Sequence, residues 1–260
     1  MTSTSVRRHK ATGLVVLLAA LVSTGFGYAA VTSTAEAAAP MASQTAIDEG
    51  RQLFLEGCAT CHGLGAQGSS DGPSLIGVGA AAVDFQVTTG RMPLAQPANQ
   101  APRKAPIYNE AQVAALAAYI ASLGPGPAIP TEAQLDTTDA NLAEGGELFR
   151  TNCAQCHNFA GRGGALSDGK YAPSMMNSTA REIYEAMLTG PQNMPNFPDT
   201  TMPEEQKQAI IKFIAHLQTA SDPGGLALGS FGPVTEGVFI WTAGIGALLA
   251  AAVWIGAKVR

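Results

Sequence analysis

The four cysteines of this chain lie in two copies of one short motif, in which two cysteines separated by two residues precede a histidine. The copies are residues 58–62 and 153–157. With this spacing both thiols reach the same edge of a porphyrin, where each adds to one vinyl group, and the histidine that follows lies beneath the iron. Each motif therefore predicts a covalently bound haem c. The residues predicted to attach and ligate the two haems are Cys58, Cys61, His62, Cys153, Cys156 and His157.

Two other uses of paired cysteines fit this chain less well. A thioredoxin-like redox dithiol opens a helix within a βαβ pattern, and no such pattern surrounds either motif. A tetrathiolate zinc site would have to join two cysteine pairs that lie a whole domain apart in the chain. It would also leave both trailing histidines without a role, so haem attachment is the favoured interpretation.

The two motifs lie within a duplicated stretch of sequence. Residues 49–61 match residues 144–156 at a constant offset, sharing a Glu-Gly pair, a Leu-Phe pair and both cysteines. Farther along, a Thr-Gly pair followed by a Met-Pro pair occurs in residues 89–93 and again in residues 189–195. These first and second repeats indicate a duplicated domain. Each is too small to bury a large core alone, and a covalently fixed haem supplies the missing apolar surface.

Apolar residues recur at helical spacing before each motif and at the end of each repeat. The helices predicted before the motifs are residues 47–56 and 141–151. The closing helices are predicted to begin near Asn109 and Pro203, which are residue types suited to open a helix. No convincing stretch shows the period-two alternation that a half-buried strand requires. The sequence therefore predicts an all-α fold of tandem domains whose long loops wrap the haems.

Methionine is predicted to supply the second axial ligand of each iron. Apart from the histidines of the motifs, the chain has only His9, in a basic N-terminal segment, and His216, which is predicted to face solvent. Met92 and Met194 hold matching places, each before a proline that restricts the preceding backbone. Met202 also precedes a proline and stays an alternative to Met194. Histidine–methionine ligation raises the reduction potential above that of bis-histidine haem.

With both axial positions filled by the protein, no open iron site remains for oxygen, peroxide or another substrate. The sequence shows no nucleophile paired with a base, no phosphate-binding loop and no further cluster of metal-ligating residues. The glycine-rich segments 63–79 and 161–169 are interpreted as loops that cover the haems. The chain is therefore predicted to carry electrons, with catalysis left to partner subunits.

The two ends of the chain are apolar. Residues 14–31 follow three basic residues and precede the small residues 35–39, a pattern typical of a secretory signal peptide and equally of an uncleaved signal anchor. No charge occurs between Glu236 and Lys258, and residues 234–257 are therefore predicted to form a transmembrane helix. A buried core helix would rarely run so long without a polar residue.

The distribution of charge predicts an orientation in the membrane. Basic residues flank the outer side of both apolar segments, and the positive-inside rule puts both ends in the cytoplasm and the repeats on the extracytoplasmic side of the cell membrane. The formal net charge of −5 includes those basic residues, so the region between them is more acidic still. This charge excludes a nucleic-acid-binding protein. The flanking residues are Arg7, Arg8, Lys10, Lys258 and Arg260.

These features divide the chain into an N-terminal signal or anchor, two haem domains, two linkers and a C-terminal transmembrane helix. The predicted boundaries are residues 1–40 for the signal or anchor, 41–126 and 139–220 for the haem domains, 127–138 and 221–233 for the linkers and 234–257 for the transmembrane helix.

Each repeat resembles a class I cytochrome c in its helix running into the CxxCH motif, its glycine- and proline-rich loop, its Met-Pro pair and its closing helix. Two such repeats with a C-terminal helix resemble the diheme cytochrome c subunits of actinobacterial-type bcc menaquinol:cytochrome c reductases. That resemblance implies a chain that takes electrons from the Rieske iron–sulfur subunit and passes them to cytochrome c oxidase. It also implies the cytochrome b subunit as a partner, within a supercomplex.

Other cytochrome classes stay as alternatives. The chain could be a stand-alone membrane-anchored diheme carrier or the cytochrome subunit of a periplasmic dehydrogenase. Soluble diheme cytochromes of that kind usually lack a C-terminal anchor, so residues 234–257 favour the reductase subunit. A cytochrome domain fused to an oxidase subunit would carry copper ligands, which this chain lacks.

Overall fold

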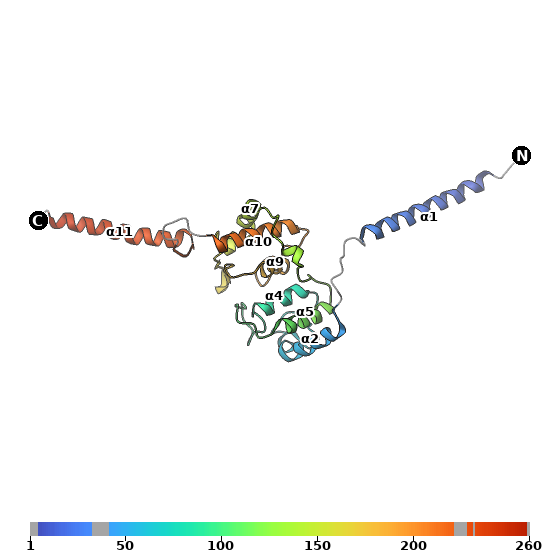
Figure 1. Ribbon diagram of the computed structural model, residues 1–260, viewed down its shortest axis with the longest axis horizontal. Coiled ribbons are helices and arrows are strands. Elements are labelled where there is room, and N and C mark those ends of the chain that lie inside the picture. The colour runs from blue at the N-terminus through green and yellow to red at the C-terminus, as the bar shows by residue number, and fades with distance from the viewer. Residues whose placement is uncertain (1–4, 33–41, 221–227, 231, 259–260) are drawn as a thin grey trace. The chain divides into compact units, whose positions relative to one another are not determined.

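The computed structural model describes residues 5–32, 42–220, 228–230 and 232–258 (Figure 1). Helix α1 (Ser5–Thr32) belongs to a unit that ends at Ala42, and the rest of the described chain belongs to a second unit. Within the described part of α1, Thr12–Gly27 is apolar. The small residues 35–39, expected near a cleavage site, lie outside the described residues.

The first repeat folds into four helices, of which the outer two pack against each other. Ser43 caps the first of them by accepting a hydrogen bond from the Ala46 N–H, and Asn109 forms a reciprocal capping box with Gln112 at the start of the last. The predicted helix starts are therefore close to the observed ones. The helices are α2 (Gln44–Gly57), α3 (Ala59–His62), α4 (Ala80–Thr88) and α5 (Glu110–Ser122).

The second repeat has the same order of helices, with α6 before them and a two-stranded ribbon in the loop. The ribbon is antiparallel, with Gly164 opposite Ala172. It was not predicted, because two-residue strands are too short to show an alternating pattern. The elements are α6 (Glu132–Leu135), α7 (Leu142–Asn152), α8 (Ala154–His157), β1 (Gly164–Ala165), η1 (Ser167–Gly169), β2 (Tyr171–Ala172), α9 (Ala180–Thr189) and α10 (Glu204–Thr219).

Two middle helices, α4 and α9, were also absent from the prediction. Helix α4 is short, and its apolar residues are spread around the helix axis, so it shows no helical periodicity. Helix α9 does carry a sequence signal, since Thr179 and Glu182 form a capping box at its start. The two helices pack against each other and join the repeats (Figure 1).

The duplicated Glu-Gly pair marks the point where the outer helices of each repeat cross. A Cβ atom on Gly50 would lie 1.9 Å from the Ala115 carbonyl oxygen, and one on Gly145 would lie 1.9 Å from the Ala209 carbonyl oxygen. Only glycine permits this approach of α2 to α5 and of α7 to α10. An aromatic pair packs across each of these two helix pairs, with ring centroids 5.4 Å apart in both repeats: Phe54 with Tyr119, and Phe149 with Phe213.

After η2 (Leu228–Ser230), the described chain ends in helix α11 (Pro233–Lys258). The segment Val234–Lys258 is the one helix among the described residues that is long and apolar enough to cross a membrane, and none of its apolar window is buried. An exposed apolar helix of this length in a chain with two packed repeats is what a membrane anchor requires.

Candidate haem sites

Each cysteine pair lies on a single helical turn that follows a longer helix. In the first repeat α2 ends at the motif, and the His62 N–H donates to the Cys58 carbonyl oxygen at 3.0 Å. In the second, the His157 N–H donates to the Cys153 carbonyl oxygen at 2.9 Å. All four thiols are free and half-buried. One helical turn thus fixes the spacing of the two sulfur atoms and of the histidine that follows.

Both motif histidines are oriented by the same kind of hydrogen bond. The distance from Nδ1 to a proline carbonyl oxygen is 2.8 Å for His62 with Pro73 and 3.0 Å for His157 with Pro173. A carbonyl only accepts, so Nδ1 must carry the proton, which leaves the Nε2 lone pair for a metal. Burial also lowers the pKa of His157 and favours its neutral form. Iron-ligating histidines need this tautomer.

The carbonyls that orient the histidines belong to a Pro-Ser pair that recurs in the duplicated sequence. Only the structure shows the role of this pair. A Pro-Ser pair recurs in the two repeats, at residues 73–74 and 173–174. The recurrence was visible in the sequence, but the pair carries no metal ligand, so nothing in it indicated a contact with the histidine. In both repeats the proline carbonyl of this pair accepts the hydrogen bond from the histidine Nδ1 and so fixes the orientation of the imidazole ring.

Burial favours the protonated form of the first thiol in each motif. Burial raises the pKa of the Cys58 thiol to about 11, with a further contribution from Cys61, and burial beside Cys156 does the same for Cys153. A redox-active dithiol has the opposite shift, because its nucleophilic thiol has a lowered pKa. Across the described part of the chain, no three histidine, cysteine or carboxylate side chains come together as a metal cluster. The two cysteine pairs therefore serve separate sites.

In the second repeat, the predicted haem ligands surround one cavity of about 340 Å³. Cys153, Cys156, His157 and Met194 all line it, together with apolar side chains of α9 and α10. Thiols to attach a porphyrin, two axial ligand types and apolar walls are the donor set that haem c needs. The residues of this cavity therefore fit the group that the motif predicts.

The methionines of the second repeat occupy different environments. Met194 is half-buried and lines the cavity, whereas Met202 is only 4% exposed, packs in the core and is not among the lining residues. The Met202 carbonyl oxygen accepts a hydrogen bond from the buried Lys207 at 2.7 Å, so this segment helps to hold the loop before α10. Met175 also lines the cavity, but it follows the proline that orients His157. This geometry favours Met194 over Met202.

In the first repeat, two of the predicted site residues lie against one core. Cys58 and Met92 are half-buried and pack on the cluster that contains Phe54, Leu116 and Ile120. The remaining histidine of the described repeats, His216, is exposed on α10.

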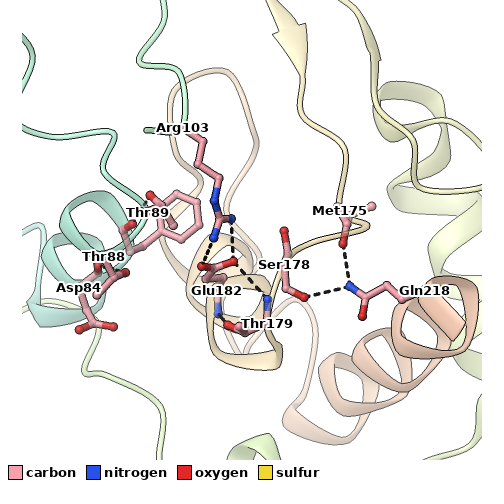
Figure 2. Close-up of polar contacts among 10 residues, drawn as sticks. Asp84, Thr88, Thr89, Arg103, Met175, Ser178, Thr179, Glu182 and Gln218 are labelled. Atoms are coloured by element: carbon pink, nitrogen blue, oxygen red, sulfur yellow. Dashed lines mark hydrogen bonds and ion pairs between the residues drawn. The ribbon is translucent and has the colours of Figure 1, made fainter. Parts of the chain in front are cut away.

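The cavity of the second repeat has a wall that the sequence did not predict, because the residues of this wall come from the first repeat. Arg103, in the loop between α4 and α5, reaches Glu182 on α9 with two hydrogen bonds, of 2.9 and 2.6 Å (Figure 2). Nearby, the Gln100 side chain donates to the Tyr171 carbonyl oxygen at 2.6 Å. These residues and Arg91 line the cavity that holds His157.

A pair of acidic residues is buried where α4 meets α9. Glu185 is fully buried and Asp84 is 7% exposed, and neither carboxylate oxygen of Glu185 has a hydrogen-bond partner of ordinary geometry among the described residues. Burial raises the pKa of Glu185 to about 10, and the neighbouring Asp84 raises it further. Glu185 is therefore a neutral acid at pH 7.

Family models match both repeats. The model described as cytochrome c covers residues 47–124, and the one described as cytochrome c oxidase, cbb3-type, subunit III covers residues 140–214. Among solved structures, a chain of the Kuenenia stuttgartiensis reducing HAO-like protein complex aligns with 65% of this chain and 95% of its own length. Its TM-score of 0.35 and sequence identity of 15% are too low to inform the fold.

Curated relatives match nearly the whole chain. A Corynebacterium efficiens protein is 46% identical over 269 residues, which cover 96% of this chain and 90% of that protein. A Mycobacterium bovis protein is 46% identical over 258 residues, which cover 96% of this chain and 92% of that protein. Both are named cytochrome bc1 complex cytochrome c subunit. With this identity, and with a CxxCH motif in each of two cytochrome c domains, the chain belongs to the family of cytochrome c subunits of the cytochrome bc1 complex.

Proposed function

We propose that this chain is the diheme subunit of a bcc-type quinol:cytochrome c reductase that relays electrons from the Rieske iron–sulfur subunit to cytochrome c oxidase. The observation that carries the proposal is the repetition of one complete ligand environment. Both repeats present two thiols, a histidine held by a proline carbonyl and a half-buried methionine. Two electron-carrying sites in one membrane-anchored subunit can replace a soluble carrier between two enzymes.

Each residue of these environments has a distinct task. Cys58 and Cys61 in the first repeat, and Cys153 and Cys156 in the second, hold two covalent haem c groups, which supply one-electron Fe(III)/Fe(II) chemistry. His62 and Met92 are the proposed axial ligands in the first repeat, and His157 and Met194 in the second. The apolar cores behind them exclude water, which limits the charge reorganisation that accompanies electron transfer.

The proposed arrangement in the membrane follows from the charge distribution. Residues 41–126 and 139–220 are the proposed haem domains on the extracytoplasmic side, and residues 234–257 are the proposed anchor. The basic residues at the two ends of the chain then lie in the cytoplasm. The acidic surface between them faces the partner subunits, which in this proposal are cytochrome b, the Rieske protein and the oxidase.

The proposal is tested by purifying the affinity-tagged chain from its native membranes in a mild detergent. We expect cytochrome b, Rieske and oxidase subunits to co-purify, with two haems per tagged chain by alkaline-pyridine spectroscopy and mass spectrometry. Reduction by a quinol should then reach the tagged cytochrome and, in the presence of oxygen, be followed by its reoxidation. Recovery of the free cytochrome alone would support the stand-alone carrier and contradict the relay.

A matched variant separates assembly from electron transfer. Cys153→Ala with Cys156→Ala removes the second attachment site but leaves the first repeat and α11 unaltered. We expect this variant to carry one haem and still reach the membrane. If the relay uses both haems, its quinol-driven oxygen consumption should fall to background, whereas undiminished consumption would show that the second haem is not on the path.

A further inference from the structure

Arg91 is a buried cation at the junction of the two repeats. Its side chain belongs to the first repeat and is only 8% exposed, yet it lines the cavity that contains His157 and Met194. The guanidinium carbon lies 4.7 Å from the centre of the Phe85 ring, which supports one face of the group. The Nη1 atom is buried and has no hydrogen-bond partner among the described residues.

The charges around the cavity leave this guanidinium without its own anion. Arg103 also lines the cavity, and it takes both carboxylate oxygens of Glu182 in a fork-like pair. Lys170, a third basic residue of the wall, donates to the amide oxygen of Asn193 at 3.1 Å. Glu182 is the one carboxylate on the lining, so the wall carries an excess of positive charge. Burying an unpaired cation is unfavourable, and an anionic ligand offsets this penalty.

We infer that Arg91 of the first repeat binds a propionate carboxylate of the haem attached to the second repeat. A guanidinium with a free, buried Nη1 matches a carboxylate in charge and in planar geometry. The cavity already supplies the attachment and ligand residues for that haem, and a haem carries two such carboxylates at one edge. The inference rests on haem attachment at Cys153 and Cys156, but it does not depend on which enzymes exchange electrons with the chain.

This arrangement links the two haem sites through adjacent residues. Arg91 immediately precedes Met92, the proposed axial ligand of the first haem. One short segment of backbone therefore contributes a side chain to each site. The propionate contact also fastens the repeats together, beside the Arg103–Glu182 pair shown in Figure 2. The second site is complete only when the first repeat is docked on it.

The test uses redox titration of the purified full-length holoprotein, monitored by the haem absorption bands, in Arg91→Gln, Arg91→Lys and the unaltered chain. Arg51→Gln is the matched control, because Arg51 is an exposed arginine on α2. We expect Arg91→Gln to lower the midpoint potential of the second haem, since an uncompensated carboxylate stabilises ferric iron. The midpoint should also become dependent on pH near neutrality. Arg91→Lys should restore most of the shift, and Arg51→Gln should change neither midpoint.

The second midpoint is identified independently by Met194→His, which alters that haem's ligand alone. A shift confined to the other midpoint, or no shift in either, would overturn the inference. If Arg91→Gln fails to retain its haems, the unaltered protein still decides. Its second midpoint should not vary with pH near neutrality, because the arginine keeps the carboxylate ionised, and a pH-dependent midpoint there would contradict the contact. Haem counting on the same samples reports separately whether the second attachment site is loaded.

Discussion

The two repeats share one plan but differ in how their haem sites are enclosed. Both cross their outer helices at a glycine, both pack a tilted aromatic pair across that crossing and both hold the motif histidine with a proline carbonyl. The cavity of the second repeat has walls from its neighbour, among them Arg91 and Arg103. Duplication therefore preserved the ligand geometry, while the loops made the second site dependent on the first repeat.

The second repeat also has a buried cation of its own, on its closing helix. Lys207 on α10 is fully buried and donates to Asp199 at 2.5 Å and to the Met202 carbonyl oxygen at 2.7 Å. Its ammonium lies 5.6 Å from the Tyr184 ring centre. These contacts fix the loop between Met194 and α10, so the proposed ligand segment is held by polar contacts.

Because both repeats cross their outer helices at a glycine, blocking either crossing should lower the stability of the protein by a similar amount. Gly145→Ala places a methyl group 1.9 Å from the Ala209 carbonyl oxygen, and Gly50→Ala does the same against Ala115. We expect each variant to lose about 3 kcal/mol or more of unfolding free energy, measured by thermal denaturation of the holoprotein. Gly237→Ala, where nothing lies within 4 Å, should leave stability unchanged. Tolerance of one crossing variant but not the other would show that the repeats are not packed alike.

The ligand geometry predicts parallel changes in reduction potential. Met92→His and Met194→His should each lower one midpoint by on the order of 0.1 V, within the range that axial ligands cover, with both haems still covalently attached. Redox titration of the purified chain measures this directly. Met202→Leu conserves core volume and should shift neither midpoint. A lowered midpoint in Met202→Leu, with none in Met194→His, would transfer the ligand role to Met202.

The junction between the repeats predicts a pH dependence that neither repeat would show alone. Glu185 faces Asp84 of α4 and shares α9 with Arg181 and Glu182, and its pKa is raised from 4.5 to about 10 on folding. The folded chain thus keeps a proton that the unfolded chain releases, so stability falls as pH rises from about 4.5 towards 10. The limiting slope is about 1.4 kcal/mol per pH unit.

Glu185→Gln removes this titration, so its melting temperature should exceed that of the unaltered protein increasingly as pH rises above neutrality. The melting temperature of the holoprotein, measured across the pH range, provides the comparison. Glu147→Gln is the control, because Glu147 is exposed on α7. If Glu185→Gln and the unaltered chain lose stability in parallel with rising pH, the buried acid pair is not the cause.

The sequence by itself determined the all-α class, the duplication, the haem-attachment motifs and the C-terminal apolar helix. Thioether spacing, helical periodicity and the length of an apolar run are local properties, so a single chain displays them without a structure. The observed helices α2, α5, α7 and α10 lie close to the predicted ones for this reason. The short helix α4 and the β1–β2 ribbon lack such periodicity and were missed.

Only the tertiary structure decided which contacts join the two repeats. Nothing near Arg91 in the sequence indicates that its side chain lines the cavity of the second repeat. Nothing near Glu185 indicates that it is buried against Asp84 of the first repeat. Such contacts depend on how irregular loops and two short helices pack, which no periodic pattern encodes. The role of the recurring Pro-Ser pair was likewise hidden, because it acts through a backbone carbonyl, and every residue has one.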